Sequence, residues 1–270
     1  MKFSASLSYY TIFALPSFAI ILITFLGYFL GEEEVSGNLF RQINKMVGTQ
    51  ASVQIQEIIE NSKLTKSSVL ETIVGFITLL LSASGMFGEV QSSINDIWKI
   101  KAKEKAGFMR TIVDQLFSFS MIAVFGFILA VSLLLDTFID LLYQKVSKHI
   151  DLEALLIADV LDTFFVFLVI TFLITYIFKE LPDAIIKFKD AFVGAVFTSI
   201  LFMFGKWGIG EYLESSNKFT LYGTAGSILI LLLWVYYSAI ILYFGAVFTS
   251  NYAKIYGTPI VPDEYSEFKD

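Results

Sequence analysis

The chain has 270 residues, of which 56% are hydrophobic and only 16% are charged, and its mean hydropathy is +0.71. A soluble core of this length would not bury so much apolar surface, so the composition predicts a membrane protein with several spans. The net charge is −6, and the sequence has no water-facing domain in which basic and aromatic residues cluster, so a nucleic-acid-binding surface is excluded. The absence of cysteine excludes disulfides and cysteine-ligated zinc.

The first apolar run, at about residues 7–30, is long enough to cross the hydrocarbon core of a bilayer. It is longer than the core of a signal peptide, and no small-residue cleavage site follows, so we expect an uncleaved first span. Pro16 lies in the middle of this run and predicts a kink, which serves either packing or a gating hinge.

Residues 31–68 are polar and contain two short amphipathic patterns, within 36–62. We expect two helices that cap the bundle or lie on the external membrane surface. Their apolar positions are Leu39, Ile43, Met46 and Val47 in the first pattern and Ala51, Ile55, Ile58 and Ile59 in the second.

The remaining apolar runs predict five more spans. The fold class is therefore all-α: a polytopic membrane protein with six transmembrane helices in a single domain, 1–255, followed by a polar cytoplasmic tail, 256–270. The five further spans are expected at about 69–90, 111–135, 156–178, 190–213 and 222–250.

The orientation follows from the basic loop between the second and third spans, which carries Lys99, Lys101, Lys103, Lys105 and Arg110. Positive charge close to spans on both sides retains a loop in the cytoplasm. Both termini are therefore expected to face the cytoplasm.

Four stretches carry a resemblance to the YihY/BrkB family of bacterial inner-membrane proteins, some of which have been labelled ribonuclease BN. It implies six transmembrane helices, the bacterial cytoplasmic membrane, and transport or lipid export as the suggested activity. Family members usually carry a cytoplasmic segment before the first span, and we expect its role to be absent here. The stretches are SLSYYTIFALPSF at 6–18, SASGMFGEVQSSINDIW at 82–98, LPDAIIKFKDAFVGAVFTSILFMFGKWGIGEYL at 181–213 and YGTAGSILILLLWVYYSAIILYFGAVFT at 222–249.

Several residues in these stretches are expected to have structural roles. Asn95 suits an interhelical hydrogen bond and Trp98 an interfacial anchor. Small residues on one face of the sixth span favour close helix packing, with the lining of a cavity as the alternative. The carboxylates near the cytoplasmic ends of spans, including Asp96 and Asp190, are expected to reach water. The other motif residues are Pro182, Asp183, Gly223, Gly226, Trp234 and Gly245.

Lys206 lies well inside the fifth predicted span, at about 24 Å from the cytoplasmic face. A charge in hydrocarbon costs about 2.5–3.5 kcal/mol on insertion scales, so it needs a partner, a cavity or an interfacial position. Asp159 and Asp162 reach the same depth from the fourth span and, with Glu211, can surround Lys206. We hypothesise a substrate-binding pocket that opens outward, in which Lys206 holds an anionic group. A structural ion pair or a snorkelling lysine is the alternative.

The sequence lacks the parts of an enzyme. One histidine, His149, cannot supply the converging ligands of a metal nuclease, and there is neither a phosphate-binding loop nor a nucleophile elbow. We therefore expect no catalytic residues, no metal and no cofactor. We expect the protein to transport or flip an amphiphilic or anionic solute. Its expected partners are the lipid bilayer and a lipid or anionic amphiphile, and the sequence does not decide whether the chain forms a homo-oligomer. The alternative is a scaffold that organises envelope partners.

Overall fold

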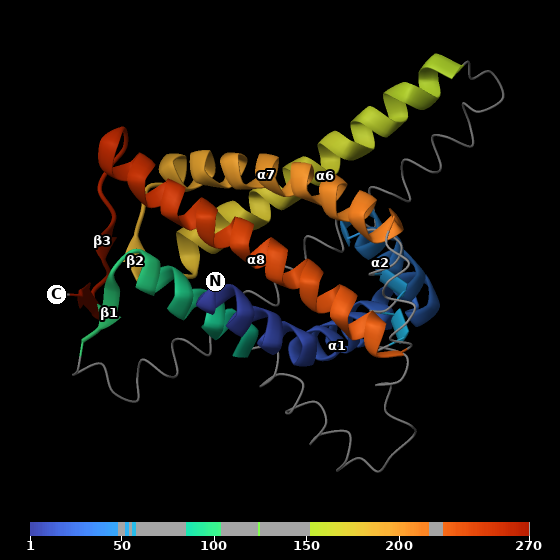
Figure 1. Ribbon diagram of the computed structural model, residues 1–270, viewed down its shortest axis with the longest axis horizontal. Helices are drawn as coiled ribbons and strands as arrows, with labels where there is room; N and C mark the ends of the chain where they lie inside the picture. The colour runs from blue at the N-terminus through green and yellow to red at the C-terminus, as the bar shows by residue number, and fades with distance from the viewer. Residues whose placement is uncertain are drawn as a thin grey trace, which may run out of the picture.

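The computed structural model describes residues 1–47, 52–53, 56–57, 85–103, 124, 152–215 and 224–269. Within these ranges the protein consists mostly of long helices (Figure 1). An additional helix, which has no label, covers residues 85–97. The labelled helices are α1 (Lys2–Leu30), α2 (Glu32–Val47), α6 (Leu152–Glu180), α7 (Phe188–Ser215) and α8 (Thr224–Ile255).

Among the described residues, three helices are long and apolar enough to cross a bilayer by length and composition, at Thr163–Glu180, Phe188–Ile209 and Leu231–Ile255. They lie in α6, α7 and α8, which contain nearly all of the predicted fourth, fifth and sixth spans. Most of the predicted second and third spans lies outside the described residues. The protein is a mostly helical membrane protein, and the total of six spans stays a prediction.

The first predicted span lies within α1, which starts at Lys2 and continues through Pro16. Gly31 joins it to α2 with a φ of 93°, in the left-handed region that favours glycine. Val35 and Leu39 of α2 are buried, so the first amphipathic segment packs inward by this face. The four apolar positions of the second amphipathic pattern lie outside the described residues, which include only 52–53 and 56–57 of this segment.

Helices α7 and α8 pack against each other as an antiparallel pair through two reciprocal contacts. A Cβ added to Gly194 of α7 would overlap the side chain of Thr249 on α8, and one added to Gly245 of α8 would overlap Thr198 on α7. Each threonine hydroxyl donates at 2.7 Å to the carbonyl four residues earlier, Thr198 to Gly194 and Thr249 to Gly245. The hydroxyls are thus satisfied within their own helices, and the two backbones approach closely.

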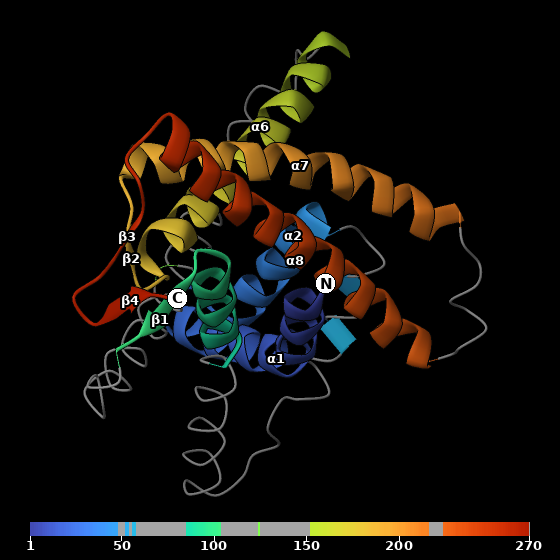
Figure 2. The same cartoon turned by 60° about the vertical axis from the view of Figure 1, so that its left-hand side comes forward.

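Four short strands, which the all-α expectation missed, lie at one end of the bundle (Figures 1 and 2). Strand β1 pairs antiparallel with β4, and β2 pairs antiparallel with β3. We call this region, made of residues 99–103, 181–187 and 256–269, the strand end. The strands are β1 (Ile100–Ala102), β2 (Ala184–Ile185), β3 (Val261–Pro262) and β4 (Ser266–Phe268).

The strand end is continuous with the apolar core of the bundle. Phe178 at the end of α6, Ile94 on the helix at 85–97 and Ile100 on β1 are all at most 1% exposed. These three side chains come from segments far apart in the sequence. Their burial in one core therefore holds the α6–α7 turn next to the loop that follows Trp98.

We predict that Gly194→Ala and Gly245→Ala each lower the free energy of unfolding by about 1–3 kcal/mol, because the new methyl group must displace a threonine on the facing helix. The measurement is thermal unfolding of the detergent-solubilised protein. Gly208→Ala on α7 is the matched control, since a Cβ there meets nothing within 4 Å, and its effect should stay within about 1 kcal/mol. Equal effects of all three substitutions would contradict the packing described here.

Candidate functional site

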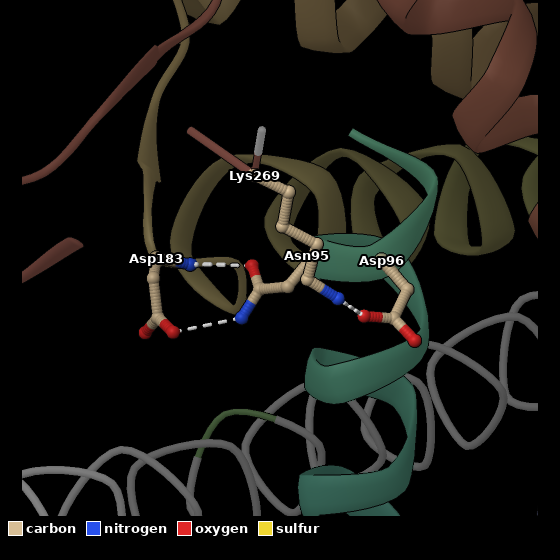
Figure 3. A network of polar contacts seen from close by, with 4 residues as sticks. All are labelled: Asn95, Asp96, Asp183 and Lys269. Atoms are coloured by element: carbon tan, nitrogen blue, oxygen red, sulfur yellow. Dashed lines mark hydrogen bonds and ion pairs between the residues drawn. The ribbon is translucent and has the colours of Figure 1, made fainter. Parts of the chain in front are cut away.

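A buried carboxylate, Asp183, lies at the centre of the strand end. Its Oδ2 accepts a hydrogen bond from Asn95 Nδ2 at 2.7 Å, and its Oδ1 accepts one from Gln91 Nε2 at 2.9 Å. Its backbone N–H donates to Asn95 Oδ1 at 2.9 Å, so Asn95 both donates to and accepts from the same residue (Figure 3). Gln91 and Asn95 are four residues apart on the helix at 85–97 and therefore share one face.

This network compensates for burying a charge. Asp183 is only 8% exposed, and a carboxylate removed from water needs strong hydrogen bonds. The two amides each supply one such hydrogen bond. The network also joins the helix at 85–97 to the turn between α6 and α7, so Asn95 and Asp183 of the motif act together.

Trp98 directly follows the helix at 85–97. Its indole Nε1–H donates to the backbone carbonyl of Ala246 on α8 at 2.9 Å, and the residue is 5% exposed. It is therefore a buried contact between helices, whereas the sequence suggested an anchor at the membrane interface. Lys99, with a φ of 58°, then turns the chain into β1.

Asp190, in the first turn of α7, is 3% exposed, although the sequence suggested a solvated carboxylate. Its Oδ2 accepts a hydrogen bond from the backbone N–H of Thr258 at 3.0 Å, and Gly257 lies directly against its carboxylate. The difference arises because the segment after α8 folds back over the start of α7. A side chain at Gly257 would not fit there.

The C-terminal segment contacts both loops of the strand end. Its backbone reaches the α6–α7 turn through Asp263 N–H, which donates to Asp183 O at 3.2 Å. It reaches the loop after Trp98 through Lys269 N–H, which donates to Lys99 O at 2.7 Å, and through Lys103 N–H, which donates to Tyr265 O at 3.0 Å.

Side-chain contacts add to this pairing on the exposed side. Lys269 forms an ion pair with Asp96 (Figure 3), and Lys101 Nζ lies 3.4 Å from Glu267 Oε1. Lys103 Nζ donates to the Glu264 carbonyl at 2.6 Å. Charged side chains thus bracket β4 from both ends.

Lys206, the centre of the hypothesised pocket, lies on α7 and is partly buried. The α7 face that it shares is fully buried nearer the strand end, with Ala191, Ala195 and Ser199 at 0% exposed. Tyr237 of α8 places its hydroxyl directly over Gly205, the residue before Lys206. Lys206 therefore lies between a buried stretch of α7 on the side of the strand end and exposed neighbours, Phe204 and Trp207.

Of the three carboxylates assigned to this pocket, only Glu211 has a side chain among the described residues. Glu211 lies on α7 and is exposed. Asp159 and Asp162 lie on α6, but their side chains are outside the description, so their pairing with Lys206 stays a prediction. The first turns of α6 stand away from the end of α7 in both views (Figures 1 and 2).

The motif residues on the sixth span also face α7 where they are described. Trp234 packs edge-on against Phe202 of α7, with ring centroids 5.6 Å apart, and Gly245 takes part in the reciprocal contact. Gly226 lies in α8, and Gly223 lies outside the described residues. Packing, rather than a cavity, accounts for the described part of this face.

Among the described residues, no group of three His, Asp or Glu side chains is placed so that it could hold a metal ion. The Asp183 network has its hydrogen bonds directed inward, onto protein groups. Its geometry suits a structural closure of this end of the bundle.

A family model described as "Virulence factor BrkB" matches residues 1–263. The chain is 26% identical over 262 residues to a UPF0761 membrane protein of Stenotrophomonas maltophilia (strain K279a), a match that covers 95% of this chain. It is 24% identical over 254 residues to a UPF0761 membrane protein of Haemophilus influenzae (strain 86-028NP), covering 93% of this chain and 89% of the relative.

A UPF0761 membrane protein of Vibrio vulnificus (strain YJ016) is 27% identical over 251 residues, covering 90% of this chain and 75% of the relative. The match to the S. maltophilia relative spans only 58% of that protein's length. No solved structure matches the chain.

We predict that Asn95→Ala lowers the free energy of unfolding by about 1–3 kcal/mol or more, because it leaves the buried Asp183 carboxylate and N–H without their partner. Thermal unfolding in detergent measures the loss, and hydrogen exchange should rise in the α6–α7 turn. Asn251→Ala is the control, since this exposed amide donates to Val247 O of its own helix. A loss at Asn95 no greater than at Asn251 would contradict a central role for the network.

Proposed function

Because the chain belongs to the BrkB/YihY family of membrane proteins, we propose that it moves an amphiphilic or anionic solute, such as a phospholipid, between the two sides of the bilayer. The proposal includes six spans in a bacterial inner membrane, with the strand end in the cytoplasm. The basic loop that contains Lys99, Lys101 and Lys103 supports this orientation.

The observation that carries the proposal is the position of Lys206. In the three candidate spans, every other charged residue lies within three residues of the end that adjoins the strand end, and Lys206 alone lies far from it. A charge at such a depth is costly and is characteristic of a substrate or ion pathway, or of an ion pair. The ammonium group suits an anionic headgroup better than a neutral solute.

The neighbouring groups support a polar site around this lysine. Ser199 lies on the same face of α7, and its buried hydroxyl has no hydrogen-bond partner among the described residues. The Tyr237 hydroxyl lies over Gly205, next to Lys206 in the chain. An anionic group that entered here would meet one cation and at least one hydroxyl donor within the bundle.

The two aspartates are proposed members of the site on sequence spacing alone. Asp162 precedes the end of α6 at Glu180 by 18 residues, and Lys206 follows the start of α7 at Phe188 by the same 18. The two positions are therefore equally far along their own helices from the α6–α7 turn. Asp159 lies about one turn further along, and Glu211 follows Lys206 on α7.

The strand end restricts the direction from which a solute would reach the site at Lys206. There, Asp183 is enclosed by Gln91 and Asn95, and the C-terminal segment covers Asp190. A solute would therefore enter from the opposite end of the bundle or laterally from the bilayer. The proposal requires no catalytic step and no metal, because the chain has one histidine and no cysteine.

We predict that Lys206→Met lowers the flux of an anionic lipid about tenfold in proteoliposomes, the loss expected for one charge-assisted hydrogen bond. The measurement is a leaflet-specific lipid or anion flux assay with the reconstituted full chain. Lys206→Arg should keep much of the flux, because it retains the charge. Lys189→Met, at an exposed lysine near the start of the same helix, is the matched control and should leave the flux unchanged.

Two outcomes would count against the proposal in different ways. Normal flux with Lys206→Met would show that the lysine is not part of the pathway, while transport itself would stand. No flux of any tested lipid or anion by the unmodified chain would favour the scaffold alternative, in which the protein organises envelope partners.

A further inference from the structure

The C-terminal segment and the loop after Trp98 carry opposite charge. Residues 256–270 contain four carboxylates and one lysine, and residues 99–105 contain four lysines and one glutamate. In the structure the two segments are paired through β1 and β4, with Lys101 beside Glu267. The acidic segment thus partly neutralises the basic loop.

The basic loop also lies where phospholipid headgroups are expected. The candidate spans end at Glu180 and Ile255 and begin at Phe188, all adjoining the strand end. Large apolar side chains are exposed around it, as is typical of residues that enter the membrane interface. They include Ile185, Phe188, Tyr256, Val261 and Phe268, each between 45% and 78% exposed.

The side-chain contacts of β4 lie on the exposed side of the strand end and add to its backbone pairing with β1. Both ion pairs are exposed, with Lys101 and Glu267 at 41% and 48%, and such pairs contribute little and are screened by salt. Strand β4 has three residues, and the buried hydroxyl of Ser266 within it lacks a hydrogen-bond partner among the described residues. A lysine gains a comparable amount from an anionic membrane surface.

The contacts that hold β3 are to buried residues. Thr258 donates to the buried Asp190 carboxylate, and Asp263 N–H donates to Asp183 O in the buried network. Residues 257–263 are therefore fastened to the α6–α7 turn independently of the ion pairs. Residues 264–269 are held by exposed ion pairs and by backbone hydrogen bonds to the loop after Trp98.

The geometry points to a competition: anionic phospholipid headgroups and the carboxylate of Glu267 bind the same basic loop, so β4 separates from β1 on strongly anionic membranes while β3 stays paired with β2. Lipid composition thereby controls whether the loop after Trp98 is covered. This inference does not depend on the transport activity, because it concerns only the position of the C-terminal segment.

The absence of cysteine allows a direct test with pairs of spin labels on the full chain. One pair, Ala102→Cys with Phe268→Cys, reports on β1 and β4, and both positions are exposed. A second pair, Ile185→Cys with Val261→Cys, reports on β2 and β3 as the matched control. Distances are measured in nanodiscs of phosphatidylcholine with increasing phosphatidylglycerol.

We expect the separated population of the first pair to rise about fivefold as phosphatidylglycerol is added, while the second pair stays close. Lys99→Gln should reduce this response without changing the closed fraction in phosphatidylcholine, because the Lys99 side chain has no partner among the described residues. Lys254→Gln, at an exposed lysine on the last turn of α8, should leave the response unchanged.

Three results would overturn the inference. In the first, the Ala102–Phe268 pair keeps one short distance at every lipid composition. In the second, both pairs separate together. In the third, the Lys99 variant responds like the unmodified chain.

Discussion

The hydrogen bonds between Asp183 and the two amides of Gln91 and Asn95 are the interaction on which the strand end depends. A buried loop residue needs partners both for its charge and for its backbone polar groups. Asp183 has both, because two side-chain amides of the helix at 85–97 donate to its carboxylate while its backbone carbonyl accepts from Asp263 N–H. The C-terminal segment is then placed against the same turn.

The α7–α8 pair provides the frame on which this closure is built. Trp98 donates to Ala246, the residue after the glycine that accommodates Thr198, so the closure and the helix pair share one region of α8. Asp190 extends the connection to the start of α7. Lys206 is carried on the same helix, about 16 residues beyond Asp190 and therefore about 24 Å from it.

Hydropathy alone was sufficient to predict the long helices, because a run of about twenty apolar residues matches the length of a helix that crosses the hydrocarbon core. The family resemblance was confirmed by a match over residues 1–263. Asn95 was expected to form a hydrogen bond, but its partner lies 88 residues further along the chain, a separation that no local pattern reveals. Strands of two or three residues are likewise too short for a periodic signal, so the fate of the C-terminal segment and of Asp190 could not be predicted.

The reciprocal Gly–Thr contacts have a mechanical consequence. Two contacts one helical turn apart fix both the spacing and the relative rotation of α7 and α8, and Tyr237 against Gly205 adds a third point further along. A displacement of either helix would therefore carry the other with it. The C-terminal segment adds to this coupling, because it joins the end of α8 to the start of α7 and to the α6–α7 turn.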